Sequence, residues 1–65
     1  MKMNIRKYRL EKGIKLELLA KRTGISKSAL NDYERELYSP SIETLEKIAK
    51  SLEVRITDLF ESEYK

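Results

Sequence analysis

The tightest constraint on how this chain folds is a pair of short amphipathic segments separated by only a few residues. The stretch from Leu16 to Arg35 reads LELLAKRTGISKSALNDYER, and its first segment ends at Gly24. Glycine adopts the left-handed backbone conformation that closes a helix at little steric cost. Ser26 then offers a favoured N-cap for the second segment. The pattern therefore predicts a helix-turn-helix motif over residues 16–35.

Small and apolar residues occupy the positions where the two helices of this motif would meet. Ala20 lies at the expected crossing point, where a small side chain lets the two backbones approach closely. In a motif of this kind the second helix usually enters the major groove of DNA. The residues expected to pack inside the corner are Leu19, Ile25, Leu30 and Tyr33.

Helix-ending residues and helical periodicity elsewhere extend this pattern to the whole chain. Gly13 is expected to close a helix before the motif, and Pro40 followed by Ser41 is expected to start one after it. No segment shows the alternation that marks a strand. We therefore expect an all-α fold, a compact five-helix bundle forming a single domain over residues 1–65. The expected helices cover residues 3–12, 16–23, 27–35, 42–52 and 56–61.

Composition excludes most classes of enzyme. The 65 residues include no cysteine and no histidine. The commonest metal ligand, general base and thiol nucleophile are therefore all missing. We expect no catalytic residue, no metal site and no cofactor, and no small-molecule ligand is evident.

Charge is distributed unevenly along the chain. Lysine and arginine total 14 against 11 aspartate and glutamate, for a formal net charge of +3, and most of the basic residues fall within residues 1–27. Such a distribution orients a molecule in the field of a polyanion, although a solvated helix face has the same appearance. No apolar run approaches the roughly 18 residues of a membrane span, and the N-terminus lacks the apolar core of a signal peptide. We expect a cytoplasmic protein without membrane contact.

A series of short segments, taken in order, carries a family resemblance. They are Ile-Arg-Lys-Tyr-Arg at 5–9, Leu-Ala at 19–20, Gly-Ile-Ser at 24–26, Glu-Arg at 34–35, Pro-Ser at 40–41, Thr-Leu at 44–45, Ile-Ala-Lys-Ser-Leu at 48–52 and Asp-Leu-Phe at 58–60. Over about residues 4–60 the chain resembles the phage-repressor-like family of helix-turn-helix transcriptional regulators, also called the Cro-like or xenobiotic-response-element family. The resemblance implies a lambda-repressor-like DNA-binding domain and a repressor that binds a palindromic operator in double-stranded DNA as a homodimer. It also implies association with the nucleoid of a bacterium or phage host.

The resemblance assigns DNA contacts to individual positions. It implies that Lys27, Ser28 and Asp32 face base edges in the major groove, with Asn31 beside them. Side-chain chemistry agrees, since lysine can donate to guanine, asparagine can pair with adenine and aspartate can accept from cytosine. The expected phosphate contacts are Ser26, Lys15, Lys21, Tyr38 and Ser39.

Two further sets of residues are expected to stabilise the fold or to contact a second copy of the chain. The resemblance implies that Arg9 and Glu34 form an ion pair that ties the first helix to the third, and each follows a tyrosine expected to face inward. Leu59 is expected to close the core. A possible dimer contact comprises Ile56, Phe60 and Tyr64.

The chain also departs from the family pattern. Lys15 is a weaker helix cap than the usual serine or threonine, Glu36 replaces a common glycine, and Arg55 replaces a customary capping serine. Apolar residues stand where polar or basic ones are frequent, at Leu16, Leu18, Leu37 and Tyr38. One interpretation is drift on the surface of a DNA-binding protein. The alternative is a protein-interaction module of the same fold, such as an antirepressor or an antitoxin partner, which uses these apolar side chains.

Overall fold

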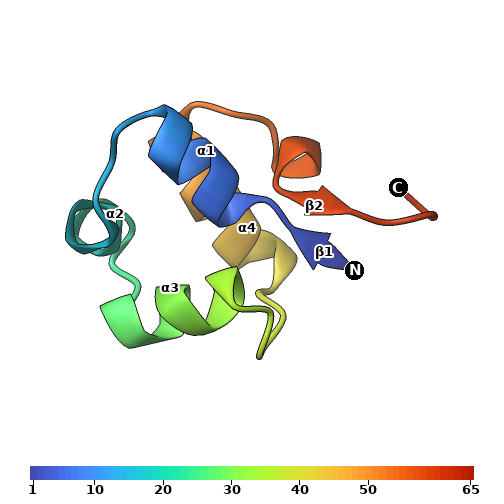
Figure 1. Ribbon diagram of the computed structural model, residues 1–65, viewed down its shortest axis with the longest axis horizontal. Coiled ribbons are helices and arrows are strands. Elements are labelled where there is room, and N and C mark those ends of the chain that lie inside the picture. Colours follow the sequence, from blue (N-terminus) through green and yellow to red (C-terminus); the bar gives the residue numbers. More distant parts are fainter.

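Four α-helices surround the core of the computed structural model, which describes residues 1–65, and a two-stranded ribbon joins the two ends of the chain (Figure 1). In Figure 1, α4 lies behind α1 and α3, while α2 and the ribbon lie at opposite ends of the molecule. The elements in chain order are β1 (Lys2–Met3), α1 (Ile5–Glu11), α2 (Leu16–Thr23), α3 (Lys27–Glu34), α4 (Ile42–Leu52), a 3₁₀ turn η1 (Ile56–Asp58) and β2 (Phe60–Glu61).

The prediction of five helices and no strand is wrong at both ends of the chain. The segment expected to form a fifth helix is the single turn η1 followed by β2, and β2 pairs antiparallel with β1, with Met3 opposite Phe60. The first helix accordingly begins at Ile5 rather than at residue 3. The backbone N–H of Asn4 donates to the carbonyl of Leu59 over 2.7 Å. This pairing joins residues far apart in sequence, so local periodicity carries no sign of it.

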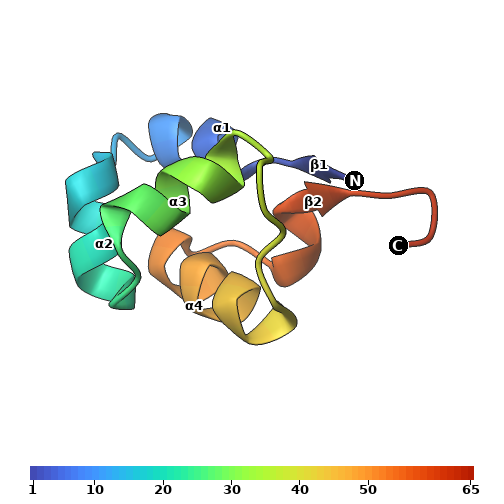
Figure 2. The same ribbon diagram turned by 90° about the horizontal axis from the view of Figure 1, so that it is seen from below.

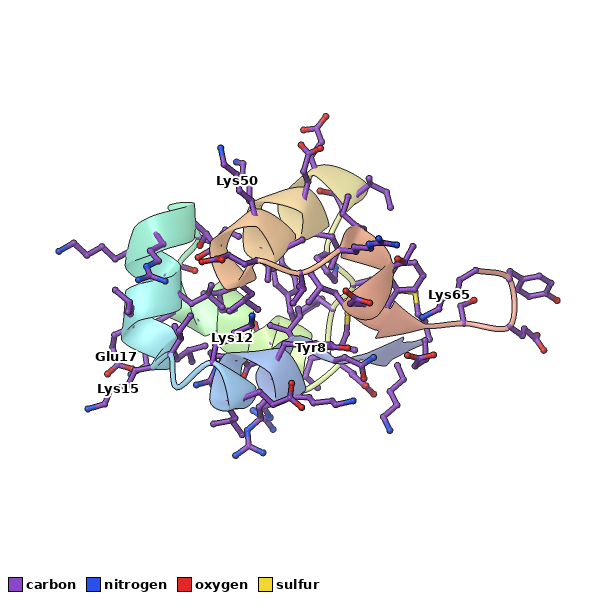
Figure 3. The ribbon with its side chains drawn as sticks, turned by 90° about the horizontal axis from the view of Figure 1, so that it is seen from above. Tyr8, Lys12, Lys15, Glu17, Lys50 and Lys65 are labelled. Atoms are coloured by element: carbon purple, nitrogen blue, oxygen red, sulfur yellow. The ribbon has the colours of Figure 1, made fainter.

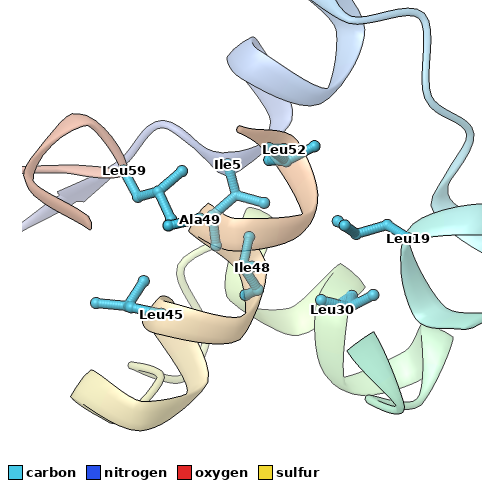
Figure 4. Packing of buried hydrophobic residues seen from close by; sticks show 8 residues of the cluster. All are labelled: Ile5, Leu19, Leu30, Leu45, Ile48, Ala49, Leu52 and Leu59. Atoms are coloured by element: carbon cyan, nitrogen blue, oxygen red, sulfur yellow. The ribbon is translucent and has the colours of Figure 1, made fainter. Parts of the chain in front are cut away.

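The core is built around α4, which contributes four of the eight buried apolar side chains (Figure 4). Leu59, just after η1, is fully buried and closes the core as expected. Burying an aliphatic side chain of this size stabilises the fold by about 1.5–3 kcal/mol. The complete cluster is Ile5, Leu19, Leu30, Leu45, Ile48, Ala49, Leu52 and Leu59.

Serine side chains start the two helices that the sequence places after Gly24 and Pro40. Ser26 Oγ accepts a hydrogen bond from the Ala29 N–H over 3.1 Å, and Ser41 Oγ accepts one from the Thr44 N–H over 3.1 Å. These caps satisfy N–H groups that have no partner within the helix. The N-cap of α2, Lys15, makes no such bond, as expected for a lysine.

Left-handed residues end the helices, and two of them are not glycine. Gly13 and Gly24 have φ values of 67° and 73°, whereas Glu36 after α3 and Glu53 after α4 have 62° and 58°. A side chain with a Cβ atom is strained in this region, at a cost of roughly 1–2 kcal/mol. Glu36 offsets part of this cost, because its Oε1 accepts a hydrogen bond from the Met3 N–H over 2.8 Å.

Glu53→Gly is expected to stabilise the domain, because glycine tolerates this backbone conformation and the Glu53 side chain makes no hydrogen bond or ion pair. The greater freedom of glycine in the unfolded chain offsets part of the gain, which leaves about 0.5–1 kcal/mol, or about 4 °C in Tm. Thermal unfolding followed by circular dichroism measures the shift. Glu36→Gly, which also loses the bond to Met3, is expected to gain less. A Tm of Glu53→Gly at or below the wild-type value would contradict the prediction.

Candidate nucleic-acid interface

The turn between α2 and α3 is closed by backbone and side-chain hydrogen bonds. The N–H of Gly24 donates to the carbonyl of Ala20 over 2.9 Å, which ends α2. The hydroxyl of Thr23 donates a hydrogen bond to the carbonyl of Leu19 over 2.8 Å, and it accepts a hydrogen bond from the N–H of Ile25 over 3.2 Å. These hydrogen bonds at the C-terminal end of α2 therefore fix the turn that leads into α3. This role of Thr23 was not predicted from the sequence, although a hydroxyl residue directly before the helix-ending Gly24 could have indicated it.

The outer face of α3 lies open to solvent. Leu30 points into the core and is fully buried, while Lys27, Ser28 and Asn31 are exposed and Asp32 is half-buried. Figure 2, seen from below, shows α3 at the front of the molecule with the loop after it. The four side chains predicted to read bases thus lie on one accessible helix, and together they offer both donors and acceptors to a ligand.

The predicted phosphate contacts are exposed as well. Tyr38 leaves 67% of its surface in solvent, and Lys15 is seen at the edge of the molecule in Figure 3. The Oγ of Ser26 caps α3, yet its hydroxyl hydrogen remains available to donate. The structure therefore leaves all five residues accessible to a polyanion, namely Lys15, Lys21, Ser26, Tyr38 and Ser39.

An ion pair across the motif was not expected from the sequence. Lys27 Nζ lies 3.2 Å from Glu17 Oε1, so the first residue of α3 is joined to the first turn of α2. The hydrogen bond from Lys27 lowers the pKa of the Glu17 carboxyl below its ordinary value, and the charge of Lys15 lowers it further. The only sequence signal was an opposite charge in the first turn of each helix.

The ion pair between Arg9 and Glu34 is confirmed, and it lies largely inside the protein. Arg9 Nε donates to one carboxylate oxygen of Glu34 over 2.7 Å, and Arg9 Nη2 donates to the other over 3.0 Å. The two side chains retain 11% and 4% of their exposure. Arg9 Nη1 also donates to the carbonyl of Ile14 over 3.0 Å. The hydrogen bond to Glu34 raises the pKa of Arg9, and the pair holds α1 against α3.

The apolar residues that depart from the family pattern do not all lie on the surface. Leu18, Leu37 and Tyr38 are exposed, but Leu16 is half-buried and packs against the core, which corrects the expectation that it is available to a partner. Leu16 is therefore a packing residue at the start of α2.

The residues of the possible dimer contact also divide between the core and the surface. Ile56 and Phe60 are half-buried and pack against the core. Tyr64 is 89% exposed.

Together, the closed turn, the capped second helix and the open polar face of that helix define a helix-turn-helix domain of the kind that binds DNA. The Helix-turn-helix family, HTH_3, matches residues 5–59. The chain belongs to this family of transcriptional regulators, as the resemblance implied, and the family is not one of enzymes.

Relatives from Bacillus subtilis are similar to most of the chain. The HTH-type transcriptional regulator SlrR is 43% identical over 91% of this chain and 40% of its own length. The regulator SinR is 41% identical over 92% of this chain and 55% of its own length. The crystal structure of SinR in complex with DNA matches with a TM-score of 0.78 and 44% identity, over 83% of this chain and 87% of that one. The chain thus spans about half the length of these curated relatives.

None of the helices combines the length and the apolar character that crossing a lipid bilayer requires.

Proposed function

We propose that this chain is the sequence-specific DNA-binding domain of a transcriptional repressor. The observation that carries the proposal is the outer face of α3, where Lys27, Ser28, Asn31 and Asp32 project from a helix that a buried ion pair fixes to α1. A helix of this size fits the major groove, where each base pair presents a distinct pattern of donors and acceptors. The similarity to SinR, a protein solved in complex with DNA, supports the same use of the fold.

Affinity and specificity come from different parts of this surface. Lys15, Lys21 and the loop that carries Tyr38 contact phosphates, which gives affinity that falls with added salt. The polar face of α3 reads base edges and gives specificity. Ser26 caps α3 and also contributes to affinity, because its hydroxyl hydrogen is free to donate to a phosphate.

The regulator acts as a dimer on a palindromic operator in the nucleoid. Two copies place their α3 helices in successive major grooves, about 34 Å apart, and the bound dimer blocks access of the polymerase. Tyr64, which is exposed beside the β1–β2 ribbon, is the candidate for a contact between the copies.

Asp32→Ala and Lys21→Ala are expected to change DNA binding in different ways. Asp32→Ala removes an acceptor for a base edge, so the sequences selected from a random duplex pool should lose a preference at one position. Lys21→Ala removes a phosphate contact, so affinity should fall about equally for all sequences, with a salt slope smaller by about 1. Thermal melts confirm that both variants fold. If Asp32→Ala selects the same sequences as the wild type, the assignment of base reading is wrong.

A second function is favoured by one observation. Leu37 and Tyr38, which are adjacent in the chain, expose 54% and 67% of their surface, as a docking site for another protein would require. In that case the domain is a protein-interaction module, an antirepressor or an antitoxin partner. A gel shift on genomic fragments at several salt concentrations distinguishes the two. Selective binding that falls steeply with salt supports the repressor, whereas no binding, with a protein that co-purifies, supports the module.

A further inference from the structure

One exposed ion pair sits at the edge of the proposed DNA-reading surface. Lys27 Nζ, on the first residue of α3, lies 3.2 Å from Glu17 Oε1 on α2. The Lys27 and Glu17 side chains expose 60% and 64% of their surface. Ion pairs this open to water are weak and are displaced by a competing charge. A DNA molecule that approaches α3 therefore meets a lysine that already has a partner.

We propose that Glu17 competes internally with DNA for Lys27, and that specific binding requires the Lys27 ammonium to leave Glu17 for a base edge. The inference rests on the proposed function, in which Lys27 reads a base. Guanine offers two acceptors, O6 and N7, to a lysine in the major groove. Glu17 thus sets how readily Lys27 is released, and it lowers the affinity for DNA without preventing binding.

The charges around Glu17 explain why release of Lys27 has a modest cost. In Figure 3, Lys15 and Glu17 lie together at the start of α2. Pairing with Lys27 is the largest influence that lowers the pKa of the Glu17 carboxyl, and the charge of Lys15 is a smaller one. When Lys27 turns to a base, and Lys15 to a phosphate, Glu17 keeps its negative charge beside a polyanion. Repulsion between like charges then opposes the complex.

Glu17→Gln is therefore expected to tighten binding to a selected operator about threefold, a modest gain appropriate to an exposed pair. Most of the gain should depend on Lys27. In a Lys27→Gln background, only the smaller gain from removing a negative charge near DNA should remain, and this double-mutant cycle isolates the coupling between the two residues. Fluorescence anisotropy with a labelled duplex measures all four proteins, and thermal melts verify that each one folds.

Glu43→Gln is the matched control for the loss of one negative charge. Glu43 is exposed, lies in the first turn of α4 and takes part in none of the ion pairs. Glu43→Gln should change the affinity for DNA less than Glu17→Gln does. The change should be by the same factor in the wild-type and Lys27→Gln backgrounds. A gain from Glu17→Gln that is equally large in the Lys27→Gln background would overturn the inference, because it would reflect general repulsion alone.

Failure of the inference and failure of the proposed function give different results. If Lys27→Gln weakens binding but Glu17→Gln leaves it unchanged, the inference alone is wrong. If Lys27→Gln leaves binding unchanged, Lys27 is not a base-reading residue, and the inference and this one assignment are wrong. If the wild-type protein selects no duplex from a random pool, the proposed function itself is wrong. The pair can also be tested without DNA, by following the Glu17 carboxyl with NMR as pH is varied. Lys27→Gln should raise the pKa of Glu17, and an unchanged pKa would show that the two residues are not paired.

Discussion

Glu34→Ala is expected to destabilise the domain by about 3–5 kcal/mol, because it leaves the largely buried guanidinium of Arg9 without its carboxylate. Domains of this length are stabilised by only about 3–10 kcal/mol in total, at roughly 0.05–0.15 kcal/mol per residue. The variant should therefore populate the unfolded state substantially near room temperature. Urea titration followed by circular dichroism measures the loss directly.

A paired substitution distinguishes a stranded charge from a lost contact. Arg9→Met combined with Glu34→Leu removes both charges and keeps apolar volume, so it should recover most of the stability that Glu34→Ala loses. Recovery in the double variant would assign the loss to the stranded charge. A Glu34→Ala protein within about 1 kcal/mol of the wild type would show that the pair does not hold α1 against α3, since exposed pairs contribute no more than this.

Replacing the polar face of α3 with alanine is expected to abolish sequence discrimination while the domain still folds. Alanine is the best helix former, and three of the four positions are exposed, so α3 should persist. The positions are Lys27, Ser28, Asn31 and Asp32. Affinity for the selected operator should fall by about 10³-fold or more, to the level of a scrambled duplex. Anisotropy titrations with both duplexes measure the ratio.

The control for this variant alters an exposed polar face elsewhere. Glu46→Ala with Lys47→Ala changes α4, whose exposed residues are not assigned to DNA, and leaves the net charge the same. It should keep both the affinity and the discrimination. If the α3 variant still prefers the operator, base reading lies outside this helix.

The sequence predicts the central elements of this fold well because their signals are local. The bounds of α2 and α4 agree with the prediction, since Gly24 and Ser41 mark an end and a start by their own conformational preferences. The ion pair between Arg9 and Glu34 could be predicted only from the family resemblance, because the spacing of two residues 25 positions apart does not indicate that they meet.

What the sequence did not predict depends on contacts between distant or exposed residues. The strand pairing of Met3 with Phe60 is non-local, and it converts an apolar stretch that resembles a helix into a turn and a strand. The pairing of Glu17 with Lys27 depends on the angle at which α2 meets α3. The candidate base-reading face was predictable because α3 is a regular helix, whose inner side is identified by Leu30.

The ribbon of β1 and β2 brings the first and last residues of the domain to the same end of the molecule, away from α2 (Figure 1). Chains whose termini lie close together tolerate circular permutation. A short linker from Lys65 to Met1 should therefore allow new ends to be opened in the loop between α1 and α2, with the order of the helices in the gene changed and their arrangement in space retained. The ribbon thus places residues 1 and 65 where a short linker can connect them.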